Sequence, residues 1–487
     1  MDSTATRPGA RTAPIPVAQE TLEALRERLH RANESVETRI SMLPTRMSRF
    51  PHRLRGIGGT DSRYVVPSVV AIGPYHHGRP HLQEMEEVKH AAAYRLCRDS
   101  GRSVEEVYAK VFSVAGDARR CYDDDGALLP LGGGPLSDAE FATMMFVDGC
   151  FLVWFIHEED ALTIGCYFSS GPSIYKDIHM LENQIPWLVL ESLMEFRPVD
   201  AVNWIDNDVA YFFYRKETKV RPWRLQRLFL VEQIVILVKH RRRLFPRKEK
   251  NSQTDTSAER NTNTSSHGDG DHSNMPPHLL GLLRFRMISG MPPKKRSSAS
   301  GDPSFLSRSA VDLAQIGVKL TASTRRAGWF VDMNVQPVFA ELSLLPLLLD
   351  HVNACRLVNM AALEATEAFA ASTRETDGYV VSSYLSTLAM LMDREEDVHE
   401  LRRRGVLSSN FSNAETLAFF KGLGQHLRLG KNYTTTLREI DDYVRRRPVR
   451  IAVHKFIYNN YRVIAALLSV AGVLASILKA LYSLKKP

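Results

Sequence analysis

The feature that most constrains this chain is an uncharged apolar run, VIAALLSVAGVLASIL, at Val463–Leu478. Its hydrophobic residues would occupy all sides of a helix, and such helices are buried in a protein core or in a membrane. A membrane-spanning helix needs about 20 residues. The segment reaches that length if Lys479 extends its ammonium towards the membrane surface. We therefore predict one transmembrane helix over residues 461–484; the alternative is a helix buried in the protein body.

Positive charges are concentrated before this run and predict its orientation. Six basic residues precede it: Arg445, Arg446, Arg447, Arg450, Lys455 and Arg462. Lys485 and Lys486 follow it. Because the cytosolic flanks of membrane helices carry the excess of lysine and arginine, the body is expected in the cytosol. No apolar signal segment stands at the N-terminus. These features predict a tail-anchored, single-pass protein of the plasma membrane or the endoplasmic reticulum.

The cysteines agree with a cytosolic body. There are five of them, at Cys97, Cys121, Cys150, Cys166 and Cys355. Their odd number, wide spacing and lack of a C-x-x-C pair favour reduced thiols over a disulfide framework or a zinc site. Glycosylation sequons are also present, at Asn33, Asn263, Asn410 and Asn432. Glycans on these asparagines would indicate the opposite topology.

The rest of the chain predicts a mainly α fold. Its 487 residues are 44% hydrophobic and 24% charged, which is ordinary for a folded domain. Apolar residues recur at helical spacing, so we expect a multi-helix globular body with few short strands over residues 17–445, plus one C-terminal transmembrane helix. Residues 1–16 and the insertion 251–274 contain almost nothing to bury and are predicted to be disordered.

Several elements of this body can be placed individually. Ser137 and Glu140 form an S-x-x-E capping box before the core helix Phe141–Ile156. Tyr64–Ile72 is β-branched but interrupted by Pro67, which predicts extended chain or a short edge strand. Further helices are expected over Glu84–Arg95, Ala340–His351 with a kink at Pro346, Leu357–Phe369, Ser382–Met392 and Ala414–Leu427.

Three motifs stand out from this helical pattern. The first contains Gly73, Pro74, Tyr75, His76, His77 and Gly78. The second lies inside the apolar stretch MFVDGCFLVWFI and contains Asp148, Gly149 and Cys150. The third lies inside MLENQIPWLVLESL and contains Glu182, Asn183, Gln184 and Pro186.

These motifs favour structural roles. Buried polar groups must be hydrogen-bonded, so the side chains of the third motif are expected to satisfy backbone groups where Pro186 interrupts a helix. His76 and His77 are expected to bond backbone in a tight turn, and Glu86 and Lys89 to form a local ion pair.

The alternative for the first motif is a metal site. The imidazoles and carboxylate that could contribute are those of His76, His77, His81, Glu84 and His90. There is no H-E-x-x-H, and Gly78 and Pro80 break any helix between the first histidines. No phosphate-binding G-x-x-x-x-G-K-[ST] loop and no G-x-S-x-G elbow occurs either. The sequence therefore assigns no catalytic residue, metal ligand or cofactor.

In their order and combination, the three motifs resemble the plant DUF247 (UPF0481) family. Leu82, Met85, Glu86 and Lys89 match the continuation of its first block, whereas Trp154 and Gly281 stand where the family commonly has acidic residues. The resemblance covers about residues 40–484. It implies a plant-restricted, membrane-associated protein with a C-terminal membrane helix and no established activity. Some grass members are linked to pollen self-incompatibility.

The combined expectation is a non-enzymatic, membrane-anchored interaction or signalling protein whose body binds another protein. The alternative is an enzyme with an unrecognised, possibly metal-dependent site near His76–His90. A nucleic-acid partner is disfavoured by the anchor, although basic clusters such as Arg241–Arg243, Lys294–Arg296, Arg402–Arg404 and Arg445–Arg447 would allow it. The sequence identifies no small-molecule ligand.

Overall fold

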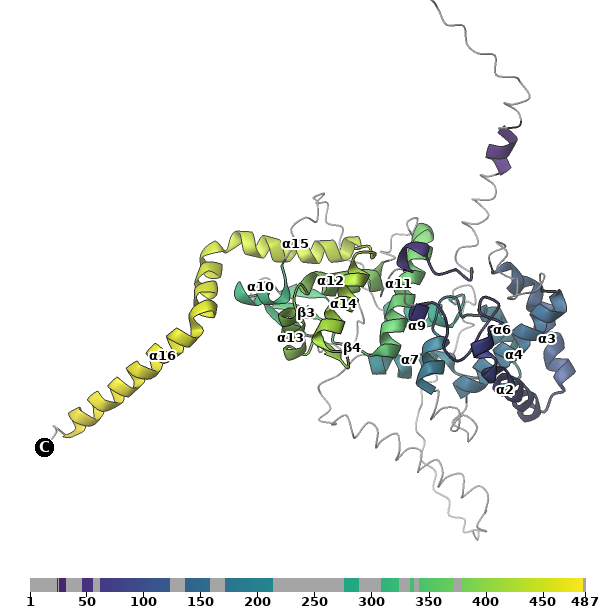
Figure 1. The fold of residues 1–487 in the computed structure, drawn as a ribbon, viewed down its shortest axis with the longest axis horizontal. Coiled ribbons are helices and arrows are strands. Elements are labelled where there is room, and N and C mark those ends of the chain that lie inside the picture. The colour runs from purple at the N-terminus through teal and green to yellow at the C-terminus, as the bar shows by residue number, and fades with distance from the viewer. Residues whose placement is uncertain are drawn as a thin grey trace, which may run out of the picture.

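The computed structural model shows a mainly helical protein with a few short strands, as the sequence predicts (Figure 1). It describes residues 24, 26–31, 46–55, 62–122, 136–157, 171–212, 276–288, 308–323, 333–336, 341–371 and 379–484. The predicted disordered segments, 1–16 and 251–274, lie outside these residues.

Helix α4, Asp138–His157, is the centre of the first part of the fold. Ser137 caps it as predicted, since the Glu140 amide donates to Ser137 Oγ and the Ser137 amide donates to the Glu140 carboxylate. Between Phe141 and Phe155 every residue except Thr143 is buried. Three helices pack around α4: α2 (Glu84–Ser100), α3 (Val104–Arg120) and α6 (Trp187–Met194). The prediction of a core helix here is confirmed.

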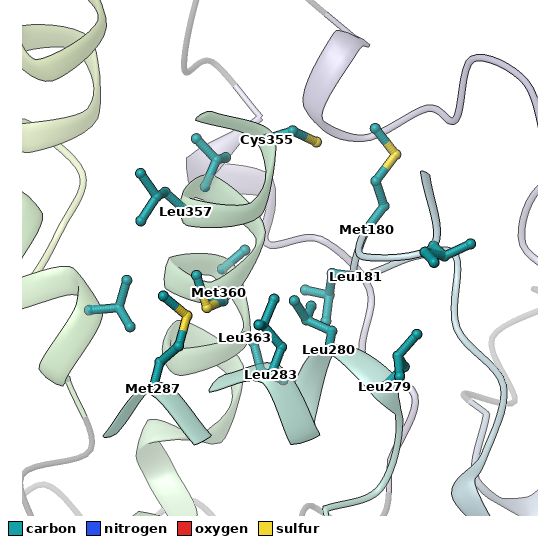
Figure 2. Packing of buried hydrophobic residues seen from close by; sticks show 14 of the residues in the cluster. Met180, Leu181, Leu279, Leu280, Leu283, Met287, Cys355, Leu357, Met360 and Leu363 are labelled. Atoms are coloured by element: carbon teal, nitrogen blue, oxygen red, sulfur yellow. The ribbon is translucent and has the colours of Figure 1, made fainter. Parts of the chain in front are cut away.

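A second group of helices follows α7, Ala201–Phe212. It comprises α9 (Leu279–Ile288), α10 (Ala310–Gln315), α11 (His351–Ala371), α12 (Val380–Leu391), α13 (Glu395–Arg403) and α14 (Asn413–Gly424). Within this group, α9 and α11 lie on the side nearest the α4 group (Figure 1). Figure 2 shows Met180 and Leu181 beside the buried leucines and methionines of α9 and α11. The segment that contains the third motif therefore packs where the two groups of helices meet.

The segment Ala340–His351, which the sequence predicts to be one helix, instead contributes strands to two small sheets. Strand β3 (Glu341–Leu344) pairs in parallel with β1 (Lys319–Ala322) and antiparallel with β2 (Asn334–Gln336). Strand β4 (Leu347–Leu349) pairs in parallel with β5 (Leu407–Ser409). The prediction of a kinked helix over Ala340–His351 is therefore wrong. The side chains of β3 alternate between half-buried and buried, which is the period of two of a strand. The many leucines in this stretch make that alternation hard to recognise in the sequence.

The other predicted elements agree closely with the structure. The helices expected near residues 84, 357, 382 and 414 are α2, α11, α12 and α14. Residues 65–72 form no strand, so of the two predictions for Tyr64–Ile72, the edge strand is wrong. Three short 3-10 turns complete this region: His52–Leu54, Ser62–Tyr64 and Pro80–Leu82.

The last two helices differ in their contact with the body. Helix α15, Lys431–Arg446, packs Tyr433, Leu437, Ile440 and Tyr443 inward. Helix α16, Pro448–Leu484, bends by 75° between Pro448–Asn460 and Val463–Leu478 (Figure 1). In the second part every side chain from Val463 to Leu478 is exposed except Ile464, which is half-buried. The alternative that this run is buried in the body is therefore wrong.

By length and composition, one helix of the described chain could span a membrane, and a second place qualifies only if a bent helix pair is counted as one span. One is α4, whose side chains are mostly buried inside the protein. The other consists of the two parts of α16, which meet that criterion together as a bent pair. The transmembrane helix over residues 461–484 thus stays a prediction.

Candidate functional site

The three motifs meet in one buried polar network, and its centre is the ion pair between Lys89 and Asp148. Lys89 Nζ lies 2.5 Å from Asp148 Oδ1, and each residue is 1% exposed. The ammonium also lies 2.7 Å from Glu86 Oε1 and donates to the Ala71 carbonyl at 3.0 Å. Its three hydrogens therefore all have acceptors. Burial favours the neutral amine, but the carboxylates of Asp148 and Glu86 outweigh burial and raise the pKa of Lys89.

Asp148 also holds the first motif in place. Its second oxygen, Oδ2, accepts from the Gly73 amide at 2.8 Å. Gly73 has a φ of +74°, and a Cβ at this position would lie 2.6 Å from the Gln184 carbonyl oxygen. Both facts require glycine, since side chains disfavour this φ and the space is already occupied. Gly73, Asp148 and Gln184 thus bring one residue from each motif together.

Asn183 joins the third motif to the chain that precedes Gly73. Its Oδ1 accepts from the Ile72 amide at 2.7 Å, and its Nδ2 donates to the carbonyls of Val70 and Asp177. The Asp177 carboxylate continues this contact by accepting from the amides of Ser68, Val69 and Val70. Residues 68–72 thus have no sheet partner but bond to side chains instead. Burial raises the pKa of Asp177, against the opposing effects of Lys176 and these amides.

Gln184 connects the third motif to α9. Its Nε2 donates to the carbonyls of Ile178 and Met180, and its Oε1 accepts from the Leu280 amide at 3.0 Å. Pro186 follows in extended conformation and is the N-cap of α6. The expectation that these polar side chains satisfy backbone groups is confirmed. Many of those groups lie far from Pro186 in the sequence.

Glu182 fastens the most N-terminal segment of the body. Its Oε1 accepts from the Phe50 amide at 2.8 Å and from an Arg55 guanidinium nitrogen at 2.7 Å. Its Oε2 lies 3.8 Å from His76 Nε2, beyond hydrogen-bond distance. Tyr75 adds a second connection to this segment, because its hydroxyl donates to the Met47 carbonyl at 2.7 Å.

His76 differs from its prediction. It is 1% exposed, and neither ring nitrogen meets hydrogen-bond geometry with a described residue, although the Val65 backbone is close enough to oppose the lowering of the His76 pKa. Burial, with a smaller contribution from the nearby Arg79 cation, lowers the pKa of His76 to about 3, so the ring is neutral. His77 Nδ1 is likewise buried without a partner there. The expectation that both rings bond backbone in a tight turn is therefore wrong for His76 and for this atom of His77.

The histidines of the predicted alternative site point to separate partners. His81 Nε2 lies 3.1 Å from the Pro67 carbonyl, and His90 Nδ1 lies 2.7 Å from the Glu86 carbonyl of its own helix. In the part of the chain that the structure describes, no group of three or more His, Cys, Asp or Glu residues could hold a metal ion.

The remaining motif residues support close packing. Gly149 lets α6 approach α4, since a Cβ there would lie 2.6 Å from Leu193 Cδ1. Cys150 is fully buried and is a free thiol whose pKa burial raises. Pro74 is buried in the turn, and Gly78 has a φ of +79° at its end. These residues shape the turn and the helix contact on which the polar network rests.

Two members of the network carried no motif signal. Asp177 precedes the third motif, and Asn359 lies on α11. Asn359 Oδ1 accepts from the Leu181 amide at 2.8 Å, and its Nδ2 donates to the Tyr64 carbonyl. Asp177 and Asn359 are both short polar residues within apolar stretches of the sequence. Because a buried polar side chain must be hydrogen-bonded, this pattern could have identified them as members of a buried network.

The network is built to hold chain segments together. The carboxylates of Asp148, Asp177 and Glu182 all accept from backbone amides, and the amides of Asn183 and Gln184 serve further backbone groups. Each of these hydrogen bonds is 3.2 Å or shorter and joins a side chain of the network to another protein group. The buried polar network therefore holds residues 47–55 and 68–78 against α4 and the third motif.

One basic cluster, Arg402–Arg404, makes contacts within the body. Arg402 donates to the Phe411 carbonyl, while Arg403 and Arg404 both pair with Glu400. Arginines that are committed to such contacts are less available to bind phosphate groups. The clusters Arg241–Arg243 and Lys294–Arg296 lie outside the described residues.

Comparison with known proteins places this architecture in one family. The family model DUF247, described as "Plant protein of unknown function", matches residues 47–475. A curated UPF0481 protein of Arabidopsis thaliana is 26% identical over 376 residues, which cover 74% of this chain and 68% of that protein. No solved structure matches the chain. The match includes all three motifs of the buried network, and the chain belongs to the DUF247 family of plant proteins of unknown function.

Proposed function

We propose that this protein is a membrane-anchored, non-enzymatic interaction protein whose second part of α16 enters a membrane while its helical body binds another protein. One observation carries the proposal: large apolar side chains are exposed along Val463–Leu478. Eight of them are 51–67% exposed: Val463, Leu467, Leu468, Val470, Val473, Leu474, Ile477 and Leu478.

Exposure of this kind is unfavourable in water. A side chain the size of valine or leucine gains about 1.5–3 kcal/mol when it is fully buried. Seven of the eight lie on one broad side of the helix and Leu468 lies outside it; the rest of the circumference carries Ala, Ser and Gly with Ile464 and no charge, so no face of the run favours water. A lipid bilayer surrounds a helix on every side and would remove all of them from water. This fit supports a membrane as the partner of Val463–Leu478.

Charge supports the proposed orientation. Arg445 and Arg446 end α15, Arg447 links it to α16, and Arg450 and Lys455 lie on the first part of α16. Cytosolic flanks of membrane helices are enriched in such residues, which favours a cytosolic body. The four described cysteines are free, which agrees with a reducing compartment. The plasma membrane and the endoplasmic reticulum are the two candidate membranes.

The buried network supports a non-enzymatic role. The polar groups of Asp148, Asp177 and Glu182 are directed at backbone groups, whereas a catalytic acid or base must reach a substrate. The motifs that are specific to the family thus maintain the shape of the body. A body with a fixed shape at a membrane is suited to binding another protein.

Proximity labelling in pollen and in vegetative tissue tests this function. The chains compared are the full protein and a variant without residues 461–487, with Leu468→Ile/Leu474→Ile as an apolar control. We expect the full chain and the control to label the same membrane-associated proteins, and the shortened chain to lose them. Unchanged location and neighbours after the deletion would overturn the anchoring role.

A further inference from the structure

The first part of α16, Pro448–Asn460, has one face directed at the body. His454 Nδ1 lies 3.2 Å from the Gln315 carbonyl at the end of α10. Tyr458, one helical turn further on and 40% exposed, lies near Arg403 of α13, whose pKa is raised by Glu400 with a smaller contribution from Tyr458. Ile451 is half-buried on the same side. Residues 451, 454 and 458 are spaced by three and four, so they share one face of the helix.

Gly317 determines how closely this helix approaches. Its φ is +83°, and a Cβ there would lie 2.9 Å from the His454 ring. Glycine thus provides both the turn that ends α10 and the space that the imidazole occupies. The contact holds Pro448–Asn460 beside α10 (Figure 1).

The opposite face is apolar and uncovered. Val449, Val453, Phe456 and Ile457 are 77%, 55%, 63% and 49% exposed. Their spacing of four, three and one residues places them on one side of the helix, away from the His454 face. A helix with one face on its own protein and an apolar stripe on the other side has room for a second contact.

Free cations flank this stripe. Arg450 and Lys455 are exposed and have no ion-pair partner within the described residues. By contrast, Arg445 pairs with Asp441 and Arg446 with Asp442 at the end of α15. The uncompensated positive charge is therefore on Pro448–Asn460 itself, next to the apolar side chains.

We propose that Pro448–Asn460 is an interfacial helix that binds an anionic lipid surface. Its Val449–Ile457 stripe would lie among the upper acyl chains, with Arg450 and Lys455 at the negatively charged headgroups. This inference rests on the proposed function, in which Val463–Leu478 crosses the membrane. A bend of 75° then places Pro448–Asn460 close to the membrane plane. Because Pro448–Asn460 also contacts α10, the body is thereby held close to the bilayer.

Maleimide labelling of an introduced cysteine tests the proposal. The full chain with Val453→Cys is reconstituted into vesicles of phosphatidylcholine and into vesicles that mix phosphatidylcholine with phosphatidylserine. Flotation first reports whether the chain is membrane-bound in each. Ser113→Cys, on the exposed side of α3, is the reference for an uncovered cysteine, and the parent chain corrects for the native thiols.

We expect Val453→Cys in mixed vesicles to react roughly tenfold more slowly than Ser113→Cys, because two cations add to the apolar contact. Arg450→Gln/Lys455→Gln should abolish most of this protection, whereas Arg53→Gln/Arg120→Gln removes the same charge elsewhere and should preserve it. Equal labelling of the two cysteines in floating protein would overturn the interfacial helix alone. Equal protection in both vesicle types would overturn its anionic preference. Failure to float would refute the membrane anchor itself.

Discussion

Lys89 on α2 and Asp148 on α4 form an ion pair that is almost completely buried, with 2.5 Å between Nζ and Oδ1. The other oxygen of Asp148 holds the Gly73 amide, so one carboxylate connects a helix pair to the turn of the first motif. This relationship explains why an aspartate lies in the middle of an otherwise apolar core helix.

Asp148→Asn should destabilise the body strongly. The asparagine retains an oxygen for Gly73 but leaves the Lys89 ammonium without its nearest anion. Removing one partner of a buried pair costs about 3–5 kcal/mol, and we expect the lower end because Glu86 remains beside Lys89. Urea unfolding measures the loss. The control is Asp393→Asn, which breaks the half-exposed pair with Lys421 and should cost less than about 1 kcal/mol. Equal losses would contradict the role of the Lys89–Asp148 pair.

Comparing Gly73→Ala with Gly78→Ala distinguishes the cost of backbone strain from the cost of steric overlap by the added methyl group. Both glycines have positive φ, +74° and +79°. A Cβ at Gly78 would meet no atom within 4 Å, whereas one at Gly73 would meet the Gln184 carbonyl oxygen at 2.6 Å. Gly78→Ala should cost about 1 kcal/mol from the backbone conformation. We expect Gly73→Ala to cost at least twice as much in the same unfolding measurement. Similar costs for the two variants would show that the first motif does not pack tightly against the third.

His76 should make the protein less stable in mild acid. Burial lowers the pKa of His76 in the folded chain to about 3, below its unfolded value of 6.5. Because the unfolded state alone takes up this proton, the stability contribution is complete above pH 6.5 and falls as the pH drops towards 3. Between pH 7 and pH 5 the loss is about 2 kcal/mol.

His76→Phe removes this titrating group and should reduce the loss of stability between pH 7 and pH 5 by that amount. His52→Gln, on an exposed turn, is the matched control and should retain the full pH dependence of the parent. Denaturant unfolding of the three chains at both pH values measures the difference. A pH dependence that is identical in His76→Phe and the parent would contradict burial of His76 as a neutral ring.

Gly317→Ala should release the first part of α16 from the body. The added methyl would overlap the His454 ring at 2.9 Å and strain the turn. Gly101→Ala is the control, since Gly101 has a φ of +69° but open space around it. Hydrogen exchange over Pro448–Asn460 should become faster in Gly317→Ala and stay unchanged in Gly101→Ala. An unchanged exchange rate in both would show that His454 does not hold this helix.

The sequence predicted the helices better than the strands for a physical reason. Helix α4 carries local signals in the sequence, namely the Ser137–Glu140 capping box and the apolar segment that follows it. Strands β3 and β4 depend on partners far away in the chain, at residues 319–322 and 407–409. The sequence around residues 340–351 does not identify those partners, and its many leucines are equally compatible with a helix.

The candidate site was predictable in part. Glu182, Asn183 and Gln184 stand out as polar residues between apolar ones, and their bonding to backbone followed from burial alone. The partners that they bond, from Phe50 to Leu280, depend on the tertiary fold. His76 shows the limit most clearly, because a histidine in a turn usually finds a partner and this ring is buried without one among the described residues.

Alkaline carbonate extraction of plant cell membranes tests the central claim, that Val463–Leu478 is embedded in a bilayer, most directly. We expect the full chain and Leu468→Ile/Leu474→Ile to stay in the membrane pellet. Leu468→Arg/Leu474→Arg should move to the supernatant, because each arginine at the centre of a membrane helix costs about 2.5–3.5 kcal/mol. Release of the unmodified chain by carbonate, or retention of the arginine variant in the pellet, would contradict the account.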